Sequence, residues 1–143
     1  MNKKVFGLKL SRSRPAREAL FSALSRAMIL SGKIVTTHAK AKAIQGEVEK
    51  FVTLAKKGDL SSRRRALSRL DNAKDALDAL FANVAPAFAE RQSGFTRIIS
   101  LPRRTGDNAK MVRMEWTEKI AVSDKSLAVS KKEKKSEPKT KSK

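Results

Sequence analysis

The sequence predicts an α+β domain in which about four helices pack on a small three-stranded sheet. Apolar residues recur at helical spacing through the first two thirds of the chain, and the spacing then changes to the alternation typical of strands. Both ends are cationic and poor in apolar residues. We therefore expect a basic N-terminal arm at 1–13, a globular domain at 14–120 and a disordered Lys-rich tail at 121–143.

The net charge restricts the kind of partner. Among the 143 residues, 33 Lys and Arg oppose 14 Asp and Glu, which gives a net charge of +19. Self-repulsion of this size destabilises a compact domain unless a polyanion neutralises it, so we expect nucleic acid, with an anionic membrane surface as the alternative. The absence of Cys excludes disulfides and thiolate metal sites, and His38 alone cannot form a His-rich site, so no metal or cofactor is expected. No apolar run approaches the ~18 residues of a membrane span.

The first helix is predicted to begin near Ser13, a residue type favoured at helix N-termini, with Pro15 tolerated in its first turn. Gly32 is suited to the left-handed conformation that ends many helices. Between them lies an apolar stripe at helical spacing, made of Leu20, Leu24, Ala27 and Met28. The acid-free start of the chain also resembles an organellar transit peptide, which remains an alternative for that segment.

A short strand and a long helix are predicted for 33–57. The β-branched run at 34–37 is typical of a strand, and Thr36 or Thr37 can cap the helix that follows directly. The helix carries an apolar stripe with spacings of four, three and four, made of Ile44, Val48, Phe51 and Ala55. Gly58 can end this helix. Gly46 lies inside it and either permits a close backbone approach or is simply tolerated.

Two shorter helices follow in the prediction. Ser61 or Ser62 is expected to cap the third helix, and Asp71-Asn72 is a second capping signal, for the fourth helix. Pro86 should end or kink that fourth helix, because proline has no N–H to donate.

From residue 95 onward, the spacing of the apolar residues changes to every second residue, which is the period of a strand. Residues 95–101 and 111–116 read as strands, joined by a turn-rich basic loop at 102–110, which favours an antiparallel hairpin. In the second strand, apolar Val112, Met114 and Trp116 alternate with Arg113 and Glu115. A two-stranded hairpin is marginal alone, so the strand at 34–37 is its natural third member.

Six separated motifs now come in the order of one protein family. They are 34–37 with Lys40-Ala41-Lys42, then 52–56, Arg63-Arg64, Leu80-Phe81, 94–98, and Arg104 with Gly106-Asp107-Asn108-Ala109. Over roughly residues 11 to 118, the chain resembles the bacterial large-subunit ribosomal protein seventeen family.

The resemblance implies helices packed on a small mixed sheet, a basic arm, and a structural role on large-subunit ribosomal RNA in the cytoplasmic ribosome. It also implies large-subunit protein thirty-two as a neighbour, and no catalytic activity. The chain departs from the family pattern in two places. Residues 1–6 replace an Arg/His-rich start, and Ser93-Gly94-Phe95 replaces a Gly-Gly-Tyr turn, so Phe95 lacks a hydroxyl.

Candidate RNA contacts are cations on the arm, at helix starts and on the loop between the last two strands. They are Lys3, Lys4, Lys9, Arg12, Arg14, Arg17, Lys40, Lys42, Arg63, Arg64, Arg97, Arg103, Arg104 and Lys110. Cations at a helix start oppose the helix dipole, which favours a role in phosphate binding over a merely solvated face. For the loop, the alternative is a floppy basic segment without a partner.

Other residues leave alternatives open. His38 either stacks on a base or caps a helix. Arg63-Arg64-Arg65 cannot all face one way, so at least one should turn toward the apolar side or pair with an acid such as Asp59. Motifs of phosphate-loop enzymes are absent, and Asp71, Asp75 and Asp78 favour a solvated face over a metal site. A nucleoid-type DNA-binding protein is the alternative function, and a cationic RNA-acting enzyme has no residues to support it.

Overall fold

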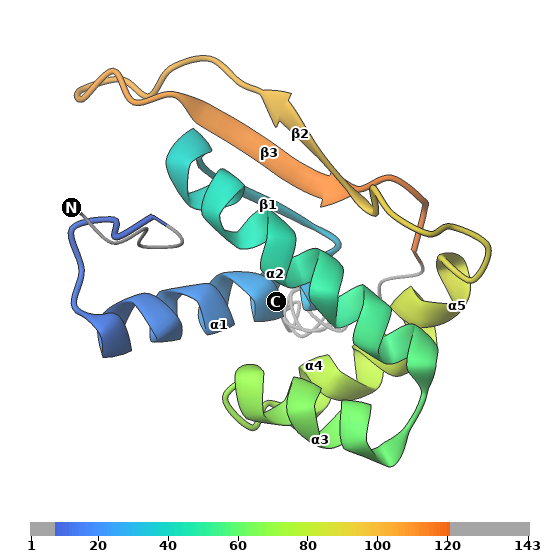
Figure 1. Cartoon of the computed structure of the whole chain (residues 1–143). Coiled ribbons are helices and arrows are strands. Elements are labelled where there is room, and N and C mark those ends of the chain that lie inside the picture. Colours follow the sequence, from blue (N-terminus) through green and yellow to red (C-terminus); the bar gives the residue numbers. More distant parts are fainter. Residues whose placement is uncertain (1–7, 121–143) are drawn as a thin grey trace, which may run out of the picture.

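The computed structural model describes residues 8–120, in which helices pack against one face of a small sheet (Figure 1). The helices are α1 (Arg14–Ser31), α2 (His38–Lys57), α3 (Leu60–Arg69), α4 (Lys74–Ala79), the π-helical η1 (Leu80–Val84) and α5 (Ala85–Ala87). The strands are β1 (Lys33–Thr37), β2 (Thr96–Ser100) and β3 (Met111–Trp116). Because α4, η1 and α5 follow one another without a break, the predicted α+β class with about four helices is confirmed. Lys3, Lys4 and the predicted disordered tail lie outside the described residues.

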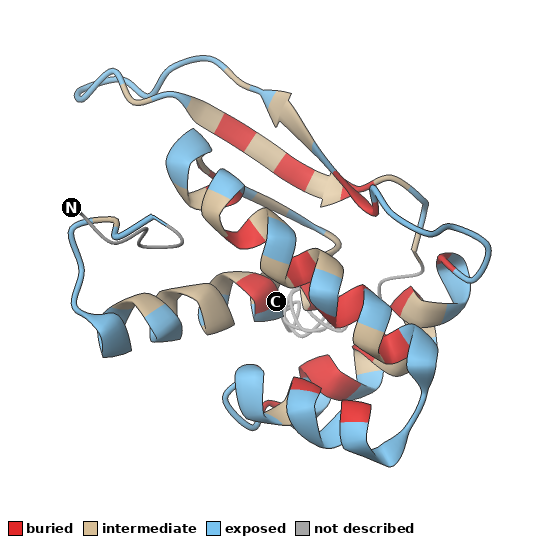
Figure 2. Ribbon diagram, viewed as in Figure 1, coloured by how far each residue is buried: buried red, intermediate tan, exposed pale blue. Residues whose placement is uncertain are grey.

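Helix α2 is the element that the others pack around. It contacts α1, α3, η1, α5 and all three strands. One side of the helix is buried along its whole length, as the recurring buried segments in Figure 2 show. The side chains concerned are Ala41, Ile44, Val48, Phe51, Val52 and Ala55. The predicted apolar stripe is confirmed, and the strands and the other helices pack against it to form the hydrophobic core.

The sheet is antiparallel throughout, so the expected mixed sheet is wrong. β3 lies between β1 and β2 and pairs with each in the opposite direction. Glu115 of β3 therefore lies opposite both Lys33 and Arg97. β1 and β2 do run in the same direction, but β3 separates them and no parallel pair forms. The antiparallel hairpin predicted for β2 and β3 is confirmed, and β1 joins it at the other edge of β3.

The two faces of the sheet differ as the alternation predicts. Val112, Met114 and Trp116 of β3 are buried against the helices, whereas Arg113 and Glu115 lie on the outer face. No described element covers that outer face in Figure 1. The sheet is thus a one-sided layer of the kind that antiparallel strands commonly form.

An aromatic cluster joins the end of the helical segment to the hairpin. The Phe88 ring lies 5.2 Å from the Phe95 ring in an edge-on arrangement and 5.7 Å from the Trp116 ring, measured between centroids. All three side chains are buried. Phe95 therefore serves as a core residue, and the Lys56 ammonium lies 5.8 Å from the centre of its ring.

Two glycines end helices as predicted. Gly32 follows α1 with φ of 72°, and Gly58 follows α2 with φ of 73°, a conformation that glycine adopts at little cost. The start predicted for α3 is wrong, because Asp59 occupies the N-cap position in place of Ser61 or Ser62. Ser62 lies on the buried face of α3, where packing against the core determines its place.

The connection into α4 and the end of the helical segment were predicted in part. Asp71 and Asn72 do not cap α4, since both adopt positive φ, 57° and 59°, in the turn before it, and Ala73 takes the N-cap position. Pro86 lies in α5, which ends one residue later at Ala87. The backbone widens into the π-helical η1 just before Pro86. Pro86 thus marks the end of the segment, as expected.

We predict that Phe51→Ala lowers the free energy of unfolding by about 3–5 kcal/mol, because it leaves a cavity at the middle of the α2 stripe. Phe51 is only 1% exposed. The measurement is urea unfolding followed by circular dichroism. Lys50→Ala changes an exposed neighbour on the same helix and should stay within about 0.5 kcal/mol of the unsubstituted protein. Equal effects of the two substitutions would contradict a core built on α2.

Candidate nucleic-acid interface

The loop between β2 and β3 is joined to the start of α2. The Lys110 carbonyl accepts a hydrogen bond of 3.0 Å from the backbone N–H of His38, the first residue of α2. At the other end of the loop, the Leu101 N–H donates to the Met111 carbonyl at 3.0 Å. The end of the loop and the start of α2 are thus joined through their backbones. We call this region the loop–helix junction, and its lysines are Lys40, Lys42 and Lys110.

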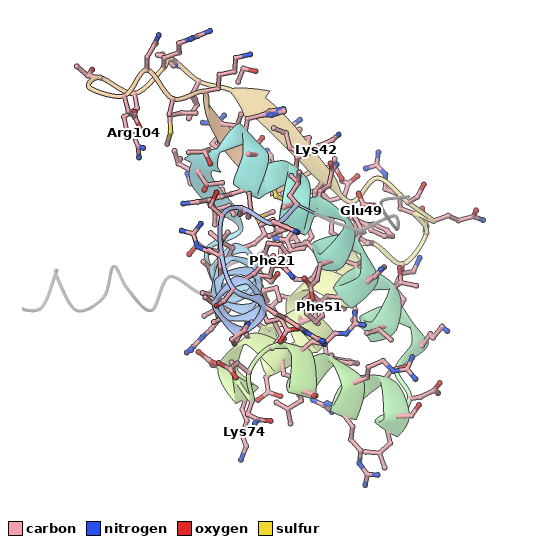
Figure 3. All side chains as sticks on the ribbon, turned by 60° about the vertical axis from the view of Figure 1, so that its left-hand side comes forward. Phe21, Lys42, Glu49, Phe51, Lys74 and Arg104 are labelled. Atoms are coloured by element: carbon pink, nitrogen blue, oxygen red, sulfur yellow. The ribbon has the colours of Figure 1, made fainter. Side chains whose placement is uncertain are left out.

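The first turn of α2 is open to an anion. Thr37 holds the N-cap position, but its side chain makes no capping hydrogen bond, and the first turn contains no acidic residue. The His38 ring does not cap the helix either, since that position belongs to Thr37. Helix N-termini with free N–H groups and a positive dipole end bind phosphate readily. Lys42 is exposed beside this turn, Lys40 is half-buried, and Figure 3 shows Lys42 on α2 and Arg104 on the loop.

The loop itself is held by its own hydrogen bonds. The Arg104 backbone N–H donates to the Ala109 carbonyl, and the Asn108 N–H donates to the Arg104 carbonyl, each at 3.0 Å. The Asp107 carboxylate accepts from the Arg104 Nε at 3.0 Å and from the Ala109 N–H at 3.2 Å. Arg103 and Lys110 are exposed on this hydrogen-bonded loop and form no ion pair with another described residue. The loop therefore presents its cations from a folded turn.

Four of the predicted arginines are engaged in ion pairs with acids. Arg104 pairs with Asp107 within the loop. The other three pairs are Arg14 with Glu18 at 2.8 Å, Arg63 with Asp78 at 3.2 Å, and Arg97 with Glu115 at 2.6 Å. Each pair reduces the net charge that its arginine offers to a phosphate. Such exposed pairs contribute only about 0–1 kcal/mol, so a phosphate can compete with the acid.

Glu115 lies at the centre of a small network on the outer face of the sheet. Its Oε2 lies 2.9 Å from the Arg113 Nε, although the two groups are not aligned as a hydrogen bond. The hydrogen bond from Arg97, helped by the positive charge of Arg113, lowers the pKa of the Glu115 carboxyl, while partial desolvation opposes that shift. Glu115 thus stays ionised between two arginines. The outer sheet face around Arg97 therefore keeps a positive charge, because the one carboxylate of Glu115 faces the cations of Arg97, Arg113 and Lys33.

The described part of the basic arm adds cations next to α1. Lys9 and Arg12 are exposed, and the Arg12 side chain donates a hydrogen bond of 2.9 Å to the Leu10 carbonyl. Arg17 is half-buried in α1, whose first turn contains no acidic residue. The arm and the loop–helix junction are the two places where predicted cations without acidic partners in residues 8–120 gather.

The sequence interpretation of Arg63-Arg64-Arg65 was right in outline. Arg63 lies over the Phe81 ring, with its guanidinium carbon 5.0 Å from the centroid, and pairs with Asp78 in place of the suggested Asp59. Arg64 and Arg65 are both exposed. Arg65 is absent from the predicted contacts, although a helical wheel of α3 would have placed it beside Arg64 on the solvent side.

The predicted residues do not gather in the groove that lies between the helices. It has a volume of about 740 Å³ and lies between α1, α2 and the turn after α3, where Glu18, Glu47 and Asp71 make it unfavourable for phosphate. Gly46 lines it, and a Cβ at this position would have open space, so Gly46 does not permit a close backbone approach. In residues 8–120, no group of three or more acidic or His side chains could hold a metal ion. No helix in that range is long and apolar enough for a membrane span.

We predict that Arg104→Ala raises the pKa of Asp107 toward its ordinary value. The Arg104 hydrogen bond, together with that from the Ala109 N–H, lowers the pKa of the Asp107 carboxyl to about 2. The ionised carboxylate therefore stabilises the folded loop above about pH 4, and this contribution is lost as the pH falls toward 2. Carboxyl NMR shifts followed from pH 6 downward measure the midpoint. Arg103→Ala is the matched control and should leave it unchanged, whereas a midpoint near 4 in the unsubstituted protein would contradict the pairing.

Comparison with known proteins agrees with the resemblance. The family described as Ribosomal protein L17 matches residues 20–117. The chain is 48% identical over 109 residues to large ribosomal subunit protein bL17 of Hydrogenobaculum sp. (strain Y04AAS1), covering 76% of this chain and 92% of that protein. The protein of the same name from Shouchella clausii (strain KSM-K16) is 43% identical, and the match covers 76% of this chain and 96% of that protein. The one from Natranaerobius thermophilus is 46% identical, and the match covers 77% of this chain and 96% of that protein. The chain therefore belongs to the ribosomal protein L17 family.

Proposed function

We propose that this chain is a structural component of the large ribosomal subunit and that it binds ribosomal RNA through its arm and its loop–helix junction. The observation that carries the proposal is the junction, where Lys40, Lys42 and Lys110 lie at a helix start without an acid or a side-chain cap. A phosphate at the helix start would receive backbone N–H groups and the positive end of the helix dipole, and Lys40 and Lys42, which are about 200° apart around the helix, would contact different phosphates beside it. Family membership supports the choice of ribosomal RNA as the polyanion.

The mode of binding follows from the aromatic residues. Every Phe and Trp among residues 8–120 is buried or half-buried, and Phe51, Phe88 and Phe95 are at most 2% exposed. Binders that stack single-stranded bases need exposed aromatic platforms. We therefore propose that the chain recognises the phosphate backbone and the shape of folded RNA.

The proposed partners are large-subunit ribosomal RNA and, from the family resemblance, large-subunit protein thirty-two. No catalytic role is proposed. Sedimentation of a cell extract should place the protein with the large subunit, and moderate salt washing should leave it there. Recovery only in free or chromosomal fractions would overturn the proposal.

The nucleoid-type DNA-binding function makes a different prediction for isolated nucleic acids. Binding by charge alone is blind to sequence and fold, so a nucleoid protein should bind duplex DNA and ribosomal RNA fragments equally at ~0.15 M salt. The ribosomal function requires a preference for the ribosomal RNA fragments. A competition assay with the two nucleic acids at equal phosphate concentration separates the two functions.

We predict that Lys40→Ala with Lys42→Ala weakens binding to ribosomal RNA and flattens its salt dependence. Loss of two phosphate contacts should reduce the slope of log affinity against log salt by about 1.4–1.8. Lys50→Ala with Lys119→Ala removes the same charge from exposed positions outside the junction and should change the slope less. Filter binding between 50 and 300 mM salt, a range chosen to resolve the slope, measures it. Identical slopes for the two double variants would contradict a contact at the junction.

A further inference from the structure

Three hollows along α1 follow one another from the end of the described chain to the groove between the helices. The first lies at Ile120 and is also lined by Ser31, the last residue of α1. The second, of about 340 Å³, runs from Ser31 back along α1 to Ala19. Ala19, Ser22 and Asp71 line both the second hollow and the groove. Hollows that share lining residues adjoin, so a path along α1 leads from Ile120 into the groove.

The far end of this path carries carboxylates without a partner. Glu18, Glu47 and Asp71 line the groove together with two cations, Lys50 and Arg69. Glu18 is paired within α1, whereas Glu47 and Asp71 form no ion pair with another described residue. The groove thus offers two carboxylates to a cationic segment.

The middle of the path is lined by small and apolar side chains. Ala23, Ala27 and Leu30 lie there and are exposed or half-buried. Arg26 also lines it, but the Asp75 carboxylate lies 2.9 Å from its guanidinium. In Figure 1, α1 lies beside α2, with the turn between α3 and α4 below it. The path therefore has room for a peptide backbone and no unpaired cation at its middle.

The near end of the path contains a hydrogen-bond donor without an acceptor. Trp116 lines the hollow at Ile120 and is only 5% exposed. Its Nε1–H is buried and has no hydrogen-bond partner in residues 8–120. A buried donor without an acceptor costs about 1–3 kcal/mol, so we expect an acceptor from outside that range. The segment that continues from Ile120 starts in this same hollow.

This segment has the composition that the path would bind. Residues 121–143 contain eight Lys against three Asp and Glu. Two short apolar runs lie within 121–129, and Lys131-Lys132 follow them. From residue 18 to residue 31, α1 rises about 20 Å. The eleven residues from Ile120 to Lys131 span about 16 Å as a helix and up to about 36 Å when extended, so the length matches the path.

From this arrangement we propose that residues 121–143 bind along α1 as a strap, with lysines on the carboxylates of Glu47 and Asp71. The segment has too few apolar residues to fold alone, and it orders on this surface. Exposed ion pairs contribute only about 0–1 kcal/mol each, so covalent attachment to the domain is what makes the binding effective. High salt or a competing polyanion releases the strap. The inference is independent of the proposed function, because no nucleic acid takes part in it.

The test uses the full chain, which has no Cys, with a nitroxide spin label on the single substitution Ser130→Cys. We expect the amide NMR signals of Ala19 and Ser22 to lose intensity relative to the same sample after the label is reduced. Gly106 and Asn108 lie in the loop between β2 and β3, far from α1 in Figure 1, and should keep their intensity. At 1 M salt, where the Debye length is about 3 Å, the signals on α1 should return.

Substitution of the groove carboxylates tests which groups hold the strap. Glu47→Gln with Asp71→Asn should restore the signals on α1. Asn tolerates the positive φ of 57° at position 71, so the turn is retained. Glu49→Gln with Glu90→Gln removes the same charge outside the groove and should leave the loss of signal unchanged.

Three results would overturn the strap. They are equal intensities on α1 and in the loop, a loss of signal that survives the groove substitutions, and a loss that arises between copies of the chain. A mixture of spin-labelled protein and isotope-labelled protein without the spin label detects the last of these. In that mixture the signals on α1 should keep their intensity. Since no RNA is present, failure of the strap leaves the proposed function standing, and failure to bind ribosomal RNA leaves the strap standing.

Discussion

Burial of the apolar stripe of α2 is the interaction on which the rest of the structure depends. Ile44, Val48, Phe51 and Val52 are at most 1% exposed because the sheet and the other helices together cover this side of α2. Most of the stability of a helix in a protein comes from tertiary packing of its apolar face, so the packing of this stripe maintains α2. The same packing fixes where its first turn points, and the hydrogen bond from His38 to Lys110 then fixes the hairpin loop beside that turn. The packing of the α2 stripe thus determines the geometry of the loop–helix junction, although the junction lies at the surface.

The starts of the first two helices lack the acidic and capping side chains that would stabilise the free protein. α1 and α2 begin without an acidic residue in the first turn and without a side-chain cap, whereas α3 has Asp59 at its N-cap position and α4 has Asp75 in its first turn. Each omission forgoes a contribution of about 0.3–1 kcal/mol from the helix dipole and about 1 kcal/mol from a cap. A bound phosphate would supply both interactions. The starts of α1 and α2 are therefore suited to the polyanion that we propose as the partner.

Local features and the hairpin of β2 and β3 were predictable from the sequence, whereas pairings between more distant segments were not. The spacing of Ile44, Val48 and Phe51 and the helix ends at Gly32 and Gly58 are set by neighbours in the chain. The order of the strands depends on which edge of β3 each partner reaches, and the mixed sheet that the family resemblance implied was wrong. Arg63 pairs with Asp78 because α3 packs against α4, a contact that no local pattern encodes. Sequence reasoning could therefore identify candidate cations without telling paired arginines from unpaired lysines.

This distinction between arginine and lysine has a physical consequence. The described ion pairs all use arginine, whose planar fork suits a carboxylate, and they hold the loop at Asp107 and link Arg26 of α1 to Asp75 of α4. Lys40, Lys42 and Lys110 have no acidic partner in residues 8–120 and carry compact charges on flexible stems. Arginines thus mainly hold elements of the fold together, and these lysines remain available to phosphate. Some described arginines, among them Arg64, Arg65 and Arg103, form no ion pair with another described residue, so this division between the two residue types is a tendency and not a rule.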